Sequence, residues 1–443
     1  MTLIAWLNGD PVAELNDAGQ GYMSLRYREE AVRQHGPGSI LLSLKLPVRA
    51  APYPGTEAKY FLDGLLPEDH VRGALADRAR VSTEDTYGLL KAYGLDCAGA
   101  IQVTEPDQGP STRQGGVHWL DGSDLKKAIS NLPAAPLGID VDPGVRSSLG
   151  GLQGKLAVVL DSERVGLPVN GAPSTHILKP ARLTDEGIER WPGIAAAEHF
   201  AMRLTFLAGQ SKGMKVRAAE TEVRDVMGRS AILVRRFDRR GNGKSLRRIH
   251  QEDFGQSLGI TEKYQNNSYE MPRLVDIAQL LVQHSTGIAM QPLLERLTLG
   301  TILGDCDAHV RNHTVLLEDG RVELSPAYDV VPTAAWADHS RELALRIGGE
   351  IFIDDVWGKN LVDEAMSWGM RRPAATMIIR RSLEAATSLM PVLLTESKDQ
   401  GWYHPVLRDV IRGAEERIRA LTPDNRSPKG SRHVGPVHEP RRR

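Results

Sequence analysis

The sequence predicts an α+β fold in which a mixed N-terminal subdomain precedes a strand-rich lobe and a helical lobe. The first hundred residues alternate short apolar runs with turn residues. Strand-like runs recur over roughly 117–238, and apolar residues take helical spacing from about 245 onward. These observations divide the chain into an N-terminal subdomain over 1–105, a strand-rich lobe over 117–238, a helical lobe over 239–425 and a tail over 426–443.

The composition limits the class of protein. The 443 residues carry 55 Lys and Arg against 56 Asp and Glu, a net charge of −1, which excludes a generally polybasic nucleic-acid binder. Cys97 and Cys306 provide neither a disulfide framework nor a metal-ligand spacing. The longest apolar run has five residues, far below the ~20 needed to span a membrane, and the N-terminus is unlike a signal peptide. We therefore expect a cytoplasmic protein without membrane contact.

The N-terminal subdomain contains the first predicted elements. Leu3–Leu7 followed by the turn residues Asn8–Pro11 predicts a strand and a turn. Alternating apolar and polar residues over Ile40–Leu46 predict a second strand. Pro67–Arg78 is typical of a short helix, because proline is tolerated in a first helical turn. Thr104–Gly116 has no aliphatic or aromatic residue and predicts a linker.

The two lobes differ in their periodicity. In the strand-rich lobe, Pro192–Leu207 predicts a helix, and the predicted strands are Lys155–Leu160, Thr175–Leu178 and Ala231–Val234. The helical lobe is predicted to contain Val275–Val282, Leu293–Leu303, Ala374–Leu389 and Val406–Leu421. The tail carries six Lys and Arg against one Glu, which predicts a solvated disordered segment; a basic arm that touches an acidic partner or phosphate is the alternative.

Two segments of the strand-rich lobe have features of a nucleotide site. Gly144–Lys155 is glycine-rich, and small residues let backbone N–H groups approach phosphate oxygens, although for this segment taken alone a flexible surface turn is the favoured interpretation. Lys179 ends the strand THILKP in the manner of the phosphate-pairing lysine of protein kinases. Glu198 follows 19 residues later on the predicted helix and is placed to pair with Lys179. The alternatives are a solvated lysine and an exposed glutamate.

The helical lobe supplies two further motifs. Asp307 and Asn312 are five residues apart, which is the spacing of the kinase catalytic loop, although a polar surface loop would have the same pattern. Asp329 follows 17 residues after Asn312, past a predicted hairpin that can return it to the loop as a second metal-binding group. Asp305, His309 and His313 form an alternative metal cluster, which no zinc motif supports. The order of all four motifs predicts a kinase-like two-lobe fold and phosphoryl transfer with ATP and Mg²⁺.

The chain also resembles a known family over nearly its whole length. The N-terminal strings WLNGDPVAEL, LSLKLP and FLDGLLPED are similar to the N-terminal subdomain of that family. The lobes contribute SSLGGLQGK, THILKP, VRRFDRR, HQEDFGQSLG, DCDAHVRN and LSPAYDV. These strings resemble, in the same order, the HipA toxins, which are bacterial serine/threonine kinases of HipA/HipB type II toxin–antitoxin systems.

The resemblance implies a role for each matching residue. It makes Asp307 the catalytic base, lets Asn312 and Asp329 hold Mg²⁺, and places Lys179 on the nucleotide phosphates. It implies that Ser148, or the adjacent Ser147, is autophosphorylated, which displaces the loop and inactivates the kinase. The implied nucleotide-binding set is Leu149, Gly150, Gly151, Leu152, Gln153, Gly154, Lys155, Lys179, the adenine-lining backbone of Arg235, Arg236 and Phe237, and His309 and Asn312.

The departures from the family pattern are few. The loop has Gly-Gly-Leu where Ala-Gly-Ala is common, and position 235 is Arg where an acidic or apolar residue is common. Ala308 and Arg311 replace the more usual Gly and Lys, and the fork of Arg311 can alter its phosphate contact. None of these changes removes a catalytic group.

The resemblance implies a toxin kinase that phosphorylates an aminoacyl-tRNA synthetase, such as glutamyl-tRNA synthetase, and thereby halts translation and promotes persistence. Its implied partner is a HipB-like DNA-binding antitoxin, so that DNA is contacted only through the complex. The alternative is a weakly catalytic, kinase-like corepressor. A small-molecule kinase is less favoured, because the N-terminal subdomain offers a broad protein-binding surface rather than a lid.

Overall fold

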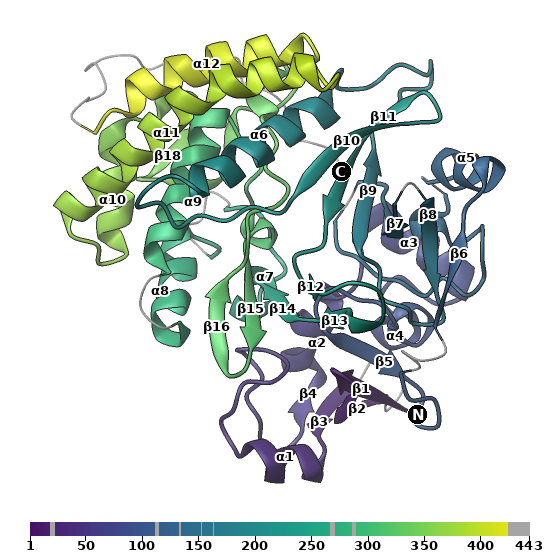
Figure 1. Ribbon diagram of the computed structural model, residues 1–443. Helices are drawn as coiled ribbons and strands as arrows, with labels where there is room; N and C mark the ends of the chain where they lie inside the picture. The colour runs from purple at the N-terminus through teal and green to yellow at the C-terminus, as the bar shows by residue number, and fades with distance from the viewer. Residues whose placement is uncertain are drawn as a thin grey trace.

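The computed structural model describes residues 1–443 except 18–22, 111–114, 133, 152, 163, 266–270, 286–288 and 424–443. The predicted α+β class is confirmed, and Figure 1 shows a small N-terminal sheet, a larger second sheet and a group of packed helices. The tail over 426–443 and Leu152 of the predicted phosphate loop lie outside the described residues.

The N-terminal part is built on a five-stranded antiparallel sheet with the order β4-β3-β2-β1-β5. Its strands are β1 (Thr2–Leu7), β2 (Asp10–Asp17), β3 (Met23–Tyr27), β4 (Tyr53–Pro54) and β5 (Ile101–Thr104). Its helices are α1 (Glu29–His35), α2 (Gly55–Gly64), α3 (Asp69–Ala79) and α4 (Thr86–Tyr93). The predicted first strand and turn are present, whereas the helix predicted from Pro67 begins at Asp69.

The segment Ile40–Leu46 is not the predicted strand. It forms a tight turn closed by a bridge between Ser43 and Leu46. The Leu42 carbonyl accepts a hydrogen bond from His250 Nε2 at 2.7 Å, and the Leu44 N–H donates to Glu252 Oε1 at 2.7 Å. The alternation correctly indicated which leucines are buried. The backbone groups, however, bind side chains 208 positions away instead of a neighbouring strand.

The second sheet has six antiparallel strands in the order β10-β11-β9-β7-β8-β6. They are β6 (Gly116–Trp119), β7 (Leu156–Asp161), β8 (Arg164–Val169), β9 (His176–Pro180), β10 (Thr221–Val226) and β11 (Arg229–Arg235). Helix α5 (Gly122–Ser130) and the turn Pro136–Gly138 precede β7, and α6 (Ile194–Gly209) packs on β10 and β11. Helix α6 begins after Gly193, so Pro192 lies before its first turn and not inside it.

The remaining chain is mainly helical. Short strands β12 (Arg239–Arg240) and β13 (Arg247–Arg248) lead to a three-stranded sheet of β14 (His250–Asp253), β15 (Thr314–Glu318) and β16 (Arg321–Leu324). The hairpin β17 (Glu342–Ile347) and β18 (Glu350–Phe352) follows. The helices are α7 (Phe254–Leu258), α8 (Leu274–His284), α9 (Met290–Leu303), α10 (Gly358–Ser367), α11 (Arg372–Asp399) and α12 (Val406–Leu421). Short 3-10 turns occur at Gly243–Ser245, Val310–Asn312, Thr333–Ala335 and Ile353–Asp355. The four predicted helices are present, and α11 extends ten residues beyond Leu389 to Asp399.

The apolar core forms two clusters that meet at the second sheet. One cluster joins the N-terminal part to that sheet and includes Phe61 and Leu233. The other joins the sheet to α6 and the C-terminal helices and includes Phe200 and Ile232. Ile232 and Leu233 belong to different clusters because successive strand residues face opposite sides. The second sheet is therefore packed between the N-terminal part and the helices.

The structure also shows the state of the two cysteines and the length and polarity of the helices. Cys97 and Cys306 are buried free thiols. Over the described residues, every helix is too short or too polar to span a bilayer.

Candidate functional site

The centre of the site is the ammonium group of Lys179, on β9 in the interior of the second sheet. It donates hydrogen bonds to Glu198 Oε1 at 2.8 Å and to Asp329 Oδ1 at 2.5 Å. Lys179 is 7% exposed and Glu198 is 2% exposed, so neither is a solvated surface charge. Of the alternatives left open by the sequence, the structure shows the pairing of Lys179 with Glu198 and not the solvated lysine or the exposed glutamate.

The charges of this triad determine its protonation. Burial by itself lowers the pKa of Lys179, but the carboxylates of Asp329 and Glu198 outweigh burial and raise the pKa. Burial would raise the pKa of Asp329, yet the cations Lys179 and Lys155 hold that pKa below its usual range. For Glu198, burial outweighs the attraction of Lys179, so the pKa is raised. Lys179 is thus held as a cation, with Asp329 as its more firmly ionised partner.

The loop that carries Asp307 is shaped by its own short-range contacts. Helix α9 ends at Gly304 with φ +86°, where a Cβ would lie 2.9 Å from the Ala334 Cβ, so glycine is required. The carboxylate of Asp305 accepts the Asp307 N–H at 3.1 Å. The amide nitrogen of Asn312 donates to the Asp307 carbonyl at 3.0 Å, which leaves the Asn312 amide oxygen for a ligand. The five-residue spacing thus closes a compact loop around exposed Asp307.

Two side chains next to Asp307 define its surroundings. Tyr264 donates its hydroxyl to Asp307 Oδ1 at 3.1 Å. The ring of His309 lies edge-on to the Tyr264 ring, with the centroids 5.6 Å apart. Burial lowers the pKa of His309, which therefore stays neutral at physiological pH. Tyr264 was not found by sequence reasoning, because an isolated tyrosine outside any motif gives no signal.

Asp329 is positioned by the residue before it. Tyr328 donates its hydroxyl to the Arg311 carbonyl at 2.6 Å and lies 2.6 Å from the Thr314 hydroxyl. These contacts hold the Asp329 segment against the loop of Asp307. Asp329 itself has φ +56°, a left-handed conformation that is uncommon outside glycine and often occurs at functional sites.

The predicted phosphate loop has a buried residue, Ser148, in its first half. The Ser148 N–H donates to the Asp96 carbonyl at 3.0 Å, and the Ser148 hydroxyl donates to the Leu65 carbonyl at 2.7 Å. Ser148 is 0% exposed, so the first half of the loop is not a flexible surface turn. Further on, Lys155 Nζ donates to the Gly150 carbonyl at 2.6 Å. Burial and the charge of Lys179 lower the pKa of Lys155 to about 8, which brings this lysine into the electrostatic environment of the triad.

The predicted adenine-lining segment has its side chains engaged elsewhere. Arg235 is exposed and pairs with Glu220 at 3.1 Å. Arg236 is buried and pairs with Asp238 at 2.7 Å, in a cluster completed by Asp96, Arg239 and Arg248. The Phe237 ring lies 5.4 Å from the Tyr328 ring. A role for this segment in holding adenine therefore rests on its backbone, as the resemblance implied.

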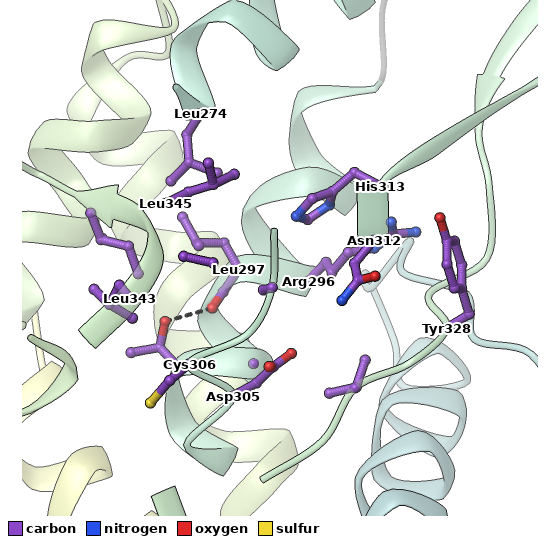
Figure 2. Close-up of a pocket in the computed structure, with 16 residues that line it drawn as sticks. Leu274, Arg296, Leu297, Asp305, Cys306, Asn312, His313, Tyr328, Leu343 and Leu345 are labelled. Carbon is purple, nitrogen blue, oxygen red and sulfur yellow. Dashed lines mark hydrogen bonds between the residues drawn. The ribbon is translucent and has the colours of Figure 1, made fainter. Parts of the chain in front are cut away.

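A small cavity of about 40 Å³ is lined in part by the loop of Asp307. Figure 2 shows its apolar wall of leucines and its polar wall, to which Asp305, Asn312 and His313 contribute. The space is too small for a nucleotide. A larger cavity of about 430 Å³ borders α6, β10 and the end of α11, and none of the predicted site residues lines it.

The structure brings some predicted residues together and leaves others apart. Lys179, Glu198 and Asp329 are in direct contact, and Asp307 and Asn312 share one loop. Within the described residues, no three His, Cys, Asp or Glu side chains gather as a metal site, so the alternative cluster does not assemble. Mg²⁺ usually takes one or two protein oxygens together with substrate phosphates, and the carboxylate of Asp329 and the amide oxygen of Asn312 are oxygens of the type it prefers.

Comparisons with known proteins agree with this arrangement. The model of the HipA-like C-terminal domain matches residues 147–390, and that of the HipA N-terminal domain matches residues 3–104. The chain is 31% identical to Y4mE of Sinorhizobium fredii over 405 residues, covering 90% of this chain and 93% of that protein. It is 26% identical over 361 residues to the serine/threonine-protein kinase toxin HipA of Shewanella oneidensis, covering 77% and 79%.

A solved structure extends the comparison to the fold. The Shewanella oneidensis HipA, determined in a complex with HipB and operator DNA, superposes with a TM-score of 0.77 at 23% identity and covers 96% of this chain and 100% of that chain. The element order, the buried lysine triad and these matches lead to one assignment. The chain belongs to the HipA family and has its mixed α+β, kinase-like fold.

Proposed function

We propose that the chain is the toxin of a type II toxin–antitoxin system and acts as an ATP-dependent serine/threonine protein kinase. The observation that carries the proposal is the triad of buried Lys179 and Glu198 with partly exposed Asp329. Three distant segments form it, and the segment of Asp329 contacts the loop of Asp307 through Tyr328. A buried ion pair contributes little net stability, which favours a functional role for a triad whose third member, Asp329, is 39% exposed. The name of the Shewanella relative supports the same activity.

In this reaction, each residue of the site would have a separate role. Asp307 orients a serine or threonine hydroxyl and takes its proton while the hydroxyl oxygen forms a bond to the γ-phosphorus and the bond to the departing ADP breaks. Lys179, held by Glu198, binds phosphate oxygens of the nucleotide. Asn312 and Asp329 would hold Mg²⁺, which would neutralise phosphate charge when bound. The segment Leu149–Lys155 covers the phosphates.

The finer assignments belong to the same proposal. The substrate is an aminoacyl-tRNA synthetase, and the loop residue Ser148 is the site of autophosphorylation. A HipB-like antitoxin is the partner, supported by the superposition on a HipA that was solved with HipB and operator DNA. We assign these roles to an N-terminal subdomain over 1–105, a strand-rich lobe over 117–238 and a helical lobe over 239–425.

The test compares the wild type with Asp307→Ala after incubation with Mg-ATP. Intact and peptide mass spectra should show one added phosphoryl group on the peptide of Ser147 and Ser148 in the wild type. Asp307→Ala should be slower by roughly 10²- to 10⁴-fold, the usual contribution of a positioned proton acceptor. Asp319→Asn, in the exposed turn between β15 and β16, is the matched control. Equal phosphorylation in Asp307→Ala and the wild type would remove this mechanism.

A further inference from the structure

A carboxylate of the N-terminal part reaches the loop of Asp307. Glu68 Oε1 accepts a hydrogen bond from Arg311 Nη1, and Glu68 Oε2 pairs with Lys263 Nζ. The three side chains are 15%, 15% and 13% exposed, so this is a largely buried ion triplet and not a surface pair. Glu68 and Arg311 are 243 positions apart in the chain. We call Glu68, Arg311 and Lys263 the interdomain clamp.

Both cations of the clamp belong to segments that flank the proposed catalytic base. Arg311 lies between Asp307 and Asn312, and its carbonyl accepts the Tyr328 hydroxyl at 2.6 Å. The Lys263 carbonyl accepts the Val310 N–H at 3.2 Å. The residue after Lys263 is Tyr264, whose hydroxyl contacts Asp307. Glu68 therefore connects the two segments that border Asp307.

Glu68 is itself held firmly. It caps α3 in an extended conformation, and its carbonyl accepts the N–H groups of Val71 and Arg72, both at 3.1 Å. Just before it, α2 packs on α7. A Cβ on Gly64 would lie 2.4 Å from the Gln256 side chain, and Gln256 Nε2 donates to the Phe61 carbonyl at 2.7 Å. The carboxylate is thus presented by a rigid turn rather than by a flexible loop.

The same turn also binds the predicted phosphate loop. The Leu65 carbonyl, three residues before Glu68, accepts the hydroxyl of Ser148 at 2.7 Å. The turn over residues 65–68 therefore contacts the loop of Ser148 on one side and the loop of Asp307 on the other. This arrangement makes the N-terminal part a structural support of both loops.

We propose that Glu68 is a positioning residue of the active site, which fixes the loop of Asp307 through Arg311 and Lys263. The proposal rests on the proposed kinase function for its kinetic readout. Arg311 is then bound by a carboxylate of its own chain, which differs from the phosphate contact that its place in the motif suggested. A carboxylate with two cationic partners is suited to this task, because it restrains two segments at once.

The first experiment is Glu68→Gln, which keeps the size of the side chain and removes its charge. Because a misplacement of about 1 Å at a reacting group costs about 10²-fold, kcat should fall by roughly 10- to 100-fold, while the KM for ATP changes by less than about threefold. Hydrogen exchange of peptides covering 303–313 should become faster. Glu68→Asp keeps the charge and should recover part of kcat.

The matched control is Glu57→Gln on α2, where an exposed glutamate of the same N-terminal part pairs with Arg49 at 3.7 Å. It should leave kcat and loop exchange unchanged. Should Glu68→Gln fail to fold, Lys263→Met retains the pair of Glu68 with Arg311 and should show the same pattern in a weaker form. Unchanged kcat together with unchanged exchange over 303–313 in the folded variants would overturn the proposal.

The two proposals fail in different ways. A wild-type protein that transfers no phosphate refutes the proposed function. The exchange comparison between Glu68→Gln and the wild type does not need turnover, and it still shows whether Glu68 holds the loop. A variant with faster loop exchange but unaltered kcat, in an active kinase, would show that the clamp is purely structural and would refute the positioning role.

Discussion

Lys179 and Asp329 form a hydrogen-bonded ion pair of 2.5 Å across 150 positions of sequence. The pair joins β9 of the second sheet to the segment that follows β16, and Glu198 on α6 completes it at 2.8 Å from the lysine. Lys179 forms ion pairs with two carboxylates. Its removal therefore leaves the more deeply buried of them, Glu198, without its ion-pair partner. This relationship makes the site testable through stability as well as through turnover.

Lys179→Met should abolish phosphoryl transfer and destabilise the fold by about 3–5 kcal/mol, the usual effect of leaving a buried charge without its partner. The added mutation Glu198→Gln should recover much of the stability, because it removes the uncompensated carboxylate, but should not restore turnover. Urea unfolding and phosphate incorporation measure the two effects. Lys91→Met, at the exposed pair of Lys91 with Glu105, is the control. Normal turnover in the Lys179→Met variant would contradict the nucleotide role.

Ser148→Glu should release the predicted phosphate loop. Ser148 is fully buried and its hydroxyl donates to the Leu65 carbonyl, a bond that a carboxylate cannot make. A charge without a partner is too costly to keep in that position, so the loop should leave it.

Hydrogen exchange of peptides covering 145–155 measures this release. Ser148→Ala should lose only about 1 kcal/mol and keep the loop protected, since it removes one hydrogen bond without adding charge. Equal protection in the Glu and Ala variants would show that the loop accommodates a charge in place.

Glu252→Gln should remove a pH dependence of stability. Burial raises the pKa of Glu252 to about 7, although the Leu44 N–H opposes the shift. A carboxyl group whose pKa is higher in the folded state than in the unfolded state stabilises the fold most at a pH below its unfolded pKa. For Glu252, this stabilisation is lost as the pH rises through about 7. At about 1.4 kcal/mol per pKa unit, the wild type should lose about 3 kcal/mol between about pH 5 and pH 8 through this group.

The variant should therefore be more stable than the wild type at the higher pH, and the two should converge at the lower pH. The free energy of unfolding at both pH values tests this. Glu323→Gln, on the exposed side of β16, serves as the control because its carboxylate is half exposed. Parallel pH profiles for Glu252→Gln and the wild type would show that Glu252 is not the group responsible.

Sequence reasoning was most successful where the signal is local. Apolar spacing located α12 over Val406–Leu421 to the residue, because helical periodicity depends on neighbours three and four positions away. A lysine that ends an apolar strand has a recognisable pattern, which singles out Lys179. The sequence allowed its pairing with Glu198 but did not favour it over an exposed glutamate, and only the fold shows the pair. The roles of Asp307, Asn312 and Asp329 stay predictions until they are tested.

The tertiary structure decided which groups become partners across long separations. The alternation over Ile40–Leu46 indicated burial, but only the fold shows that its backbone binds His250 and Glu252 instead of a strand. The motif places Arg311 at a phosphate-binding position, whereas its ion-pair partner in the fold is Glu68, a residue that no local pattern singles out. The sequence by itself determined the class of fold and the order of the motifs, since these depend on short-range spacing and residue type. The clamp and the buried site of Ser148 depend on how distant segments pack, which short-range spacing does not encode.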